Sequence, residues 1–331
     1  MNFTTPVHIP VADKHIAYTD HILSLGSCFA DNIAAKLAEY YFQITANPFG
    51  TLYNPLSIAQ ALSLQEVPEL VEWGGLFHSM YHHGSFSSPD RLQTEQHIRQ
   101  SISLLQRAFA KASVVIITFG TAWVYEWNGQ VVANCHKIPA DRFSRRRLSV
   151  EEIVAAWRPV LAAHPDKHFV FTVSPIRHIK DGLHENQLSK STLLLAIDQL
   201  TVNKNTIVCR TPSLTGTSQT TCSGVFLRGQ GESDPLGCYF PSYEILLDEL
   251  RDYRFYADDM LHPSPVAVQY IWERFVATYM SASTQQEMQP LHQLYLDRHH
   301  TLLHPDTLAS QAFLDRLTRQ TDCLRTRYPW I

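Results

Sequence analysis

The chain has 331 residues, of which 45% are apolar and 18% are charged, and its formal net charge is -4. These values are typical of a globular protein, and a weakly acidic chain lacks the basic surface that nucleic-acid binding needs. No apolar stretch approaches the roughly 20 residues of a membrane span, so we expect neither a nucleic-acid nor a membrane partner.

The start of the chain and its cysteines indicate a compartment. The N-terminus has no basic start followed by an apolar core, so we expect no signal peptide. The six cysteines are scattered and none forms a CxxC pair, which favours reduced thiols in the cytoplasm over a disulfide framework. The 17 histidines are not spaced as zinc ligands are, so we expect no metal site.

Apolar periodicity predicts alternating strands and helices in the first part of the chain. Short apolar runs indicate buried strands, and longer runs with apolar residues three and four apart indicate helices. In chain order we expect a strand at 21–25, helices at 29–42, 54–64 and 90–111, a strand at 113–120 and a hairpin at 123–134. The hairpin is indicated by Asn128-Gly129, a pair that type I′ turns prefer.

The same alternation continues in the second part. We expect a helix at 149–164, a strand at 168–175, a helix at 188–200, a strand at 206–209, a helix at 243–250, a short strand at 253–257, a helix at 265–280 and helical structure beyond 284. Ser149 and Glu152 stand in capping-box spacing at the first of these helices. Residues 211–238 lack a period and are rich in Thr, Ser and Gly, so we interpret them as a loop insertion. We interpret 77–86, which holds three histidines, as a surface loop, with the mouth of a pocket for a sugar or peptide as the alternative.

This order of elements favours an α/β fold in which a parallel central sheet is flanked by helices. Ligands of such folds bind at the carboxyl ends of the strands. The first three predicted strands end in small, polar or turn-forming residues, at Gly26-Ser27-Cys28, Gly120-Thr121 and Ser174-Pro175. We therefore expect the functional site at this edge of the sheet.

A second signal lies near the far end, in the stretch FYADDMLHPSP. Asp259 and His262 are three residues apart, in a polar turn before the helix that opens at Pro265. Such a turn can place the carboxylate against the imidazole, which leaves the other ring nitrogen free to take a proton from a nucleophile. The alternative is that Asp258, Asp259 and Ser264 only cap the helix.

Together, the two motifs resemble the SGNH (GDSL-type) hydrolases, in which the nucleophile follows the first strand and an Asp-x-x-His closes the domain. The chain is more similar still to the GSCFA family, a branch of that superfamily, whose own motif stands at 26–30. Further stretches that resemble this family lie at 47–58, 119–126, 134–139, 172–178 and 239–275.

The resemblance implies a three-layer SGNH-hydrolase-like domain over residues 1–283, with 284–331 as a helical extension packed on it. It also implies hydrolysis or transfer of an ester-linked acyl group on a small-molecule or saccharide substrate, with no cofactor and no metal. The alternative function is an SGNH-fold binding module that has lost catalysis. The oligomeric state does not follow from the sequence.

The resemblance leaves two candidate nucleophiles. Alignment on Gly26 places Cys28 where the superfamily has its nucleophilic serine, and a thiolate near a helix N-terminus and a histidine is chemically reasonable. Sliding the alignment by one residue makes Ser27 the nucleophile and Cys28 a small packing residue. In either case the resemblance makes His262 the base and Asp259 the group that orients it.

The resemblance also suggests which groups stabilise the oxyanion. Gly50 looks like the second-block glycine of the superfamily. The third block normally reads Gly-x-Asn, but here it is Gly120-Thr121-Ala122, and the asparagine is missing. Asn54 and Asn134 are the candidates to replace it, because a side-chain amide is the donor needed. His136, two residues after Asn134, is a candidate substrate contact or a structural residue.

Overall fold

Five parallel strands form the central sheet. The structure is a computed structural model, and it describes residues 4–201 and 237–331. The strands are β1 (His21–Gly26), β2 (Gln43–Ala46), β5 (Val114–Phe119), β9 (His168–Val173) and β10 (Gly237–Phe240), in the spatial order β10-β9-β5-β1-β2. Each neighbouring pair in this sheet is parallel. The predicted α/β fold with a parallel sheet is therefore confirmed.

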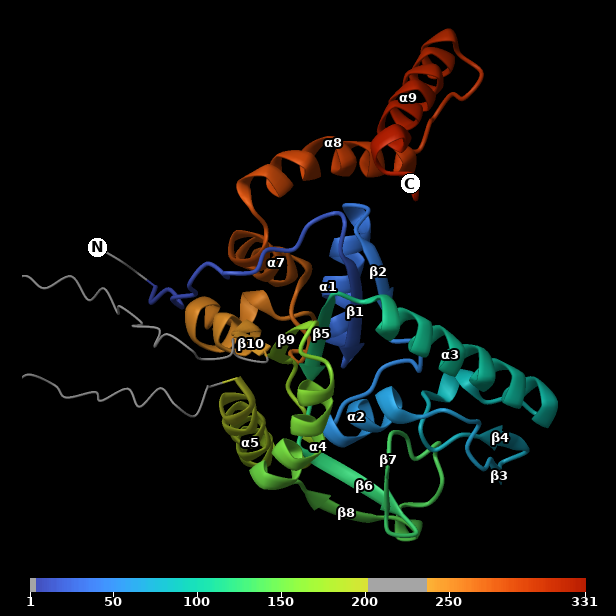
Figure 1. Ribbon diagram of the computed structural model, residues 1–331, viewed down its shortest axis with the longest axis vertical. Coiled ribbons are helices and arrows are strands. Elements are labelled where there is room, and N and C mark those ends of the chain that lie inside the picture. The colour runs from blue at the N-terminus through green and yellow to red at the C-terminus, as the bar shows by residue number, and fades with distance from the viewer. Residues whose placement is uncertain (1–3, 202–236) are drawn as a thin grey trace, which may run out of the picture.

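Helices cover both faces of the sheet, so the domain has three layers (Figure 1). The helices of one face are α2 (Pro55–Ser63), α3 (Arg91–Lys111), α4 (Val150–Ala163) and α5 (Leu183–Thr201). Those of the other face are α1 (Cys28–Glu39) and α7 (Pro265–Tyr279).

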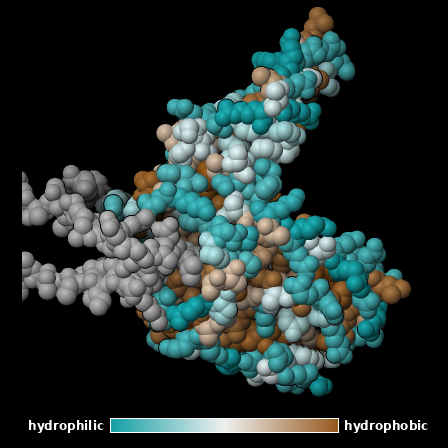
Figure 2. All heavy atoms as spheres, viewed as in Figure 1, coloured by the Kyte–Doolittle hydropathy of each residue, from teal (hydrophilic) through white to brown (hydrophobic). Residues whose placement is uncertain are grey.

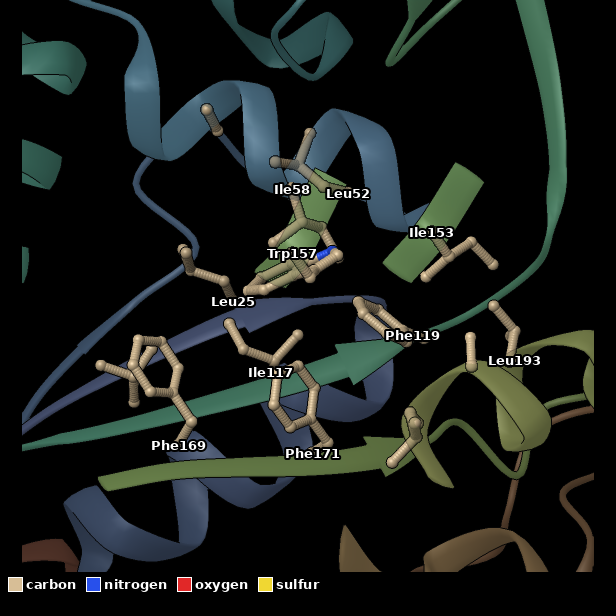
Figure 3. Close-up of a cluster of buried hydrophobic side chains, with 14 of the residues drawn as sticks. Leu25, Leu52, Ile58, Ile117, Phe119, Ile153, Trp157, Phe169, Phe171 and Leu193 are labelled. Carbon is tan, nitrogen blue, oxygen red and sulfur yellow. The ribbon is translucent and has the colours of Figure 1, made fainter. Parts of the chain in front are cut away.

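Strand residues alternate between two apolar clusters because successive side chains point to opposite faces of a sheet. On β5, Val115, Ile117 and Phe119 belong to the α2–α5 side, whereas Val114 and Ile116 belong to the α1–α7 side. In Figure 3 Phe119 of β5 and Phe171 of β9 lie against Trp157 of α4, and Ile58 of α2 lies beside that ring. Burial on both faces explains why these strands read as continuous apolar runs.

The strand order sets the position of the site. If the five strands of this sheet are renumbered 1 to 5 in chain order, their spatial order is 2-1-3-4-5. The order of addition of strands therefore reverses across the sheet between β1 and β5. In such doubly wound sheets the loops after the two strands at this switch point diverge, and ligands bind between them. Here those loops begin with Ser27-Cys28 and Gly120-Thr121.

Several predicted features are confirmed in detail. β6 (Trp123–Trp127) and β7 (Gln130–Val132) form the hairpin, with Asn128 and Gly129 both at positive φ. α4 begins with the capping box: the Ser149 hydroxyl accepts from the Glu152 N–H, and the Glu152 carboxylate accepts from the Ser149 N–H. The helix predicted at 243–250 is α6 (Ser242–Glu244), which continues as a π-helical stretch at Ile245–Leu250.

Several short strands were missed because they carry no long apolar run. They are β2, β8 (Ser144–Arg147), which pairs with β6, and the hairpin of β3 (Val71–Trp73) and β4 (Leu76–His78). The predicted strand at 253–257 is wrong: Tyr253–Phe255 form a 3₁₀ turn, and Tyr256 makes an isolated bridge to Pro263.

Two loop interpretations need correction. Residues 77–86 are not a surface loop, because His78, Ser79, Met80 and His82 are buried. Of the proposed insertion at 211–238, and of the strand predicted at 206–209, everything before residue 237 lies outside the described residues. Gly237 and Cys238 are in β10, paired with Phe169 and Val170, so the proposed loop runs two residues too far.

The chain ends in two further helices, as predicted. α8 (Ala282–His299) buries Leu291 and Leu294 in the cluster of the α1–α7 side, and α9 (Leu308–Arg327) projects beyond it (Figure 1). On the face seen in Figure 2 this projecting part is mostly hydrophilic, with hydrophobic residues at its outer end. Leu303, in the loop between α8 and α9, is 87% exposed. The division into 1–283 and 284–331 stays a prediction. None of the described helices has the length and apolar character that a bilayer span requires.

We predict that Gly26→Ala lowers the free energy of unfolding by more than about 4 kcal/mol. Gly26 has φ +142, and a Cβ built there would lie 2.1 Å from the Thr118 carbonyl oxygen of the neighbouring strand. Gly129→Ala is the matched control, because its φ is also positive but no atom lies within 4 Å of the added carbon. It should cost only about 1–2 kcal/mol. Equal losses of the two variants in urea unfolding would contradict this account.

Candidate active site

The turn after β1 brings a thiol to the start of a helix. The Ser27 N–H donates to the Thr118 carbonyl at 3.2 Å, and the Gly26 N–H donates to the Asn47 side-chain oxygen at 2.8 Å. The Asn47 amide in turn donates to Asp31 on α1 at 2.7 Å. These bonds hold the turn between β5 and the loop after β2, and α1 begins at Cys28.

Cys28 faces the histidine of the distant Asp-x-x-His turn. Its Sγ lies 3.8 Å from His262 Nε2, although 234 residues separate the two in sequence. The other ring nitrogen, Nδ1, lies 2.5 Å from the Asp259 Oδ2 carboxylate oxygen. The three side chains therefore stand in the order thiol, imidazole, carboxylate, which is the order of a nucleophile, a base and its orienting group.

Local hydrogen bonds fix the His262 turn. The Asp259 Oδ1 oxygen accepts from the N–H groups of Leu261 and His262 at 2.9 and 3.0 Å, so the carboxylate closes its own turn while its second oxygen holds the ring. The Arg177 N–H donates to the Leu261 carbonyl, which ties the turn to the segment after β9. The helix cap is supplied by Ser264, whose hydroxyl accepts from the Ala267 N–H. The carboxylate of Asp259 is thus not consumed by helix capping.

Ser27 occupies a different environment from Cys28. Its side chain is 1% exposed, and its hydroxyl has no hydrogen-bond partner among the described residues. It packs beside Gly120, where a Cβ would lie 3.3 Å from that of Ser27. Of the two candidate nucleophiles, Cys28 is the one in contact with His262.

The environment of Cys28 acts on its thiol in both directions. Burial raises the pKa of the Cys28 thiol above its ordinary value of 9.0. The backbone N–H groups of Cys28 and Phe29 and the charge of Lys190 lower that pKa, whereas the Asp31 carboxylate raises it further. Because the net effect is a raised pKa, the resting side chain is a thiol, and a base must remove its proton before it can attack.

Asp259 stays ionised over the whole range in which proteins are usually studied. The backbone N–H groups of His262 and Leu261, followed by the His262 ring, lower the pKa of Asp259 to about 2. A carboxylate that remains charged can fix the imidazole tautomer and stabilise the imidazolium once a proton has moved.

Four of the oxyanion candidates, Gly50, Asn54, Gly120 and Thr121, donate hydrogen bonds to other groups of the protein. The N–H groups of Gly120 and Thr121 both donate to the Tyr53 carbonyl, at 2.8 and 3.0 Å. The Gly50 N–H donates to the Asn47 carbonyl at 2.7 Å. The Asn54 side chain caps α2 by accepting from the Ser57 N–H, and its amide donates to the Ser57 hydroxyl. These groups build the loops around Cys28, and their donors are already engaged.

Asn134 and His136 belong to a separate polar cluster. The Asn134 oxygen accepts from the His136 N–H, and the His136 ring lies 2.8 Å from the Ser79 carbonyl and stacks on His78. In the same cluster the His82 ring contacts the hydroxyls of Ser79 and Ser101. Within the described residues, no hydrogen bond or ring contact joins this cluster to Cys28 or His262.

Residues that sequence reasoning missed also build the site. Lys190 on α5 is fully buried next to the ends of β5 and β9, and His178 follows β9 with its ring against Tyr53. The signal for Lys190 was a polar stripe, Asn186, Ser189 and Lys190, on the face of a helix that packs on the core. His178 lies in no such stripe, but it ends the family-like stretch at 172–178. Among the described residues, no group of three or more His, Cys, Asp or Glu side chains could hold a metal ion.

Comparison with models of protein families shows to which family the chain belongs. The model of the GSCFA family matches residues 21–212 and 226–275, which together cover most of the sequence. The chain belongs to the GSCFA family. The matched region of this GSCFA protein contains Cys28, Asp259 and His262, and it ends before α8. No curated protein and no solved structure gives a significant match.

We predict that acid destabilises the protein through the buried histidines of the Asn134–His136 cluster. Burial lowers the pKa of His82 to about 3, and mainly burial lowers that of His136 to about 4, from an ordinary value of 6.5. Below about pH 6.5 the unfolded chain binds protons at these sites while the folded protein does not, so the free energy of unfolding falls as the pH falls toward about 4.

His82→Gln, measured by urea unfolding at several pH values, should reduce this slope. A slope equal to that of the wild type would show that His82 does not contribute to the loss of stability.

Proposed function

We propose that this GSCFA protein is a cysteine-dependent acyl hydrolase or acyltransferase, with Cys28 as nucleophile, His262 as general base and Asp259 as the group that orients the base. The observation that carries the proposal is the contact of Cys28 Sγ with His262 Nε2 at 3.8 Å while Asp259 holds Nδ1. A sulfur–nitrogen contact of this length is loose, as contacts of this kind often are before a substrate binds.

The proposed reaction has two halves. In the first, His262 Nε2 takes the thiol proton as Cys28 Sγ attacks the carbonyl carbon of an ester, and the resulting imidazolium gives that proton to the departing alcohol. The product is an acyl thioester on Cys28. In the second half, His262 takes a proton from water or from an acceptor hydroxyl, which attacks the thioester, and the proton returns to the sulfur. The raised pKa of the thiol makes the base necessary in the first step.

The first turn of α1 offers donors for the negative charge on the carbonyl oxygen. The N–H groups of Cys28 and Phe29 lower the pKa of the Cys28 thiol and lie in the first turn of α1, at its positive end. These two groups would take the place of the missing third-block asparagine, since an oxyanion requires preorganised donors of this kind.

The relation of the GSCFA family to a larger superfamily supports the proposed substrate class. The SGNH superfamily, to which the GSCFA family is related, acts on esters of small molecules and saccharides, and such an ester is the substrate proposed here. Asp259 and His262 are each nearly half exposed, so a group on a bulky substrate can reach them without a conformational change.

A binding module without catalysis is the second candidate. It is favoured by the engaged donors of Gly50, Asn54, Gly120 and Thr121, because these candidate oxyanion groups already donate to other groups of the protein. In that case the Cys28–His262 contact would be a structural remnant.

We predict a graded loss of turnover of activated acyl esters, measured as kcat/KM. His262→Ala should lower kcat/KM by about 1000-fold or more, because it removes the base. Asp259→Asn should lower it by about 100-fold or more, because the imidazole loses the carboxylate that fixes its tautomer. Cys28→Ser should lose most turnover, since a serine hydroxyl has a far higher pKa than a thiol. Ser27→Ala is the matched control at the neighbouring position and should stay within about threefold of the wild type.

Urea unfolding of each variant controls for loss of fold. Loss of turnover in Ser27→Ala with full activity in Cys28→Ser would assign the reaction to Ser27. Absence of turnover in the wild type, with tight binding of an ester in Cys28→Ser and wild type alike, would favour the binding module.

A further inference from the structure

Lys190 is a buried cation at the end of the sheet that carries the site. Its side chain is 1% exposed, and its Nζ donates to the carbonyl oxygens of Gly120 and Ser174 at 2.6 and 2.7 Å. In the described part of the chain, no carboxylate lies within ion-pair distance of it. Burying an ammonium group is costly unless it makes good hydrogen bonds, so a lysine at this position requires a physical reason.

The two carbonyls belong to the strand ends that border the site. Gly120 directly follows β5, and Ser174 directly follows β9. Gly120 also packs beside Ser27, the residue before Cys28. One ammonium group therefore joins the ends of two neighbouring strands directly beside the turn that carries the thiol.

Lys190 shares this task with two neighbours on the same face of α5. The Asn186 oxygen accepts from the His178 N–H at 3.0 Å, and the Ser189 hydroxyl accepts from the Ala122 N–H at 2.7 Å. Residues three and four apart lie on one face of a helix, so the three side chains act on the loops after β5 and β9 together. Asn186 and Ser189 supply hydrogen bonds alone, whereas Lys190 also supplies a charge.

The charge of Lys190 acts on Cys28. Each of the two groups shifts the pKa of the other toward the ionised form, which requires that they lie within electrostatic reach. Among the described residues, the other titratable groups near Lys190 are His178 and Tyr243, and the ring centre of Tyr243 lies 5.7 Å from Nζ. Mainly burial lowers the pKa of His178 to about 3, and burial raises that of Tyr243, so both are neutral near neutral pH.

We propose that Lys190 is a positioning residue of the Cys28 site: its ammonium holds the ends of β5 and β9 together beside the thiol, and its charge favours the ionised sulfur. The inference rests on the proposed function in that Cys28 is taken as the nucleophile. The proton that leaves the sulfur goes to His262 Nε2, and Lys190 acts from the interior without taking part in the proton transfer.

This role has a signature in the pH dependence of Cys28. Burial lowers the pKa of Lys190 to about 7, so its positive charge is present below that pH and is lost above it. The electrostatic support for the thiolate is therefore strongest on the acid side and fades as Lys190 loses its proton. A residue that merely fills space would give no such pH-dependent effect.

The test is the rate at which iodoacetamide alkylates Cys28, followed by mass spectrometry of the Cys28 peptide between about pH 6 and about pH 9. In Lys190→Met the rate near pH 6 should fall by about tenfold, because the thiolate loses a nearby positive charge, and it should approach the wild-type rate at high pH. Alkylation does not depend on ester turnover, so this result stands or falls separately from the proposed function.

Lys167→Met is the matched control. Lys167 is also buried and also donates to two backbone carbonyls, Ala110 and Ala112, but it precedes β9 at the opposite end of the sheet. Its replacement should leave Cys28 alkylation unchanged. Equal alkylation profiles in the wild type and in a folded Lys190→Met variant would overturn the proposal.

If Lys190→Met does not fold, Lys190→Gln keeps a nitrogen with two N–H donors but not the charge, and it should give the same fall in alkylation rate near pH 6. A further measurement needs no Lys190 variant. In protein labelled with ¹³C at lysine Cε, the lysine that titrates near neutral pH should have a higher midpoint in Cys28→Asp than in Cys28→Asn, because a carboxylate stabilises the ammonium group. Equal midpoints would overturn the proposal.

Discussion

The close approach of two backbones at Gly26 sets the geometry of the site. A side chain at this position would collide with the Thr118 carbonyl, so only glycine lets β1 end against β5 in this conformation. The next N–H, that of Ser27, donates to the same carbonyl, and α1 starts one residue later. The thiol of Cys28 is thereby fixed at the switch point of the sheet. The turn that precedes α7, which is distant in sequence, places His262 against this thiol.

The polar groups around this turn divide into two kinds. The donors of Gly50, Asn54, Gly120 and Thr121 make hydrogen bonds that stabilise the loops, so they are not free to bind a ligand. The His262 ring contacts the sulfur instead, and the first N–H groups of α1 lower the pKa of its thiol. Rigid loops that satisfy their own backbone leave a small number of groups to act on a substrate, and preorganisation of that kind is what lowers a barrier.

Features of the fold and the site that depend on local patterns could be predicted from the sequence. Continuous apolar runs placed β1, β5 and β9, and the spacing of Asp259 and His262 indicated their turn, because both are local properties. The choice between Ser27 and Cys28 could not be made, since one residue of shift decides which side chain faces a histidine 234 residues away. Lys190 was missed because a buried lysine in a helix looks like a solvated one until the strand ends around it are known.

Capture of the covalent intermediate tests the central claim most directly. The protein is mixed with an activated acyl ester, quenched in acid and digested, and the acyl group is located by mass spectrometry. The account predicts an acyl group on Cys28 that neutral hydroxylamine removes, as it removes thioesters, and that is absent in His262→Ala. An acyl group on Ser27 that resists hydroxylamine, or a Cys28 peptide that is never acylated by an ester the protein turns over, would contradict it.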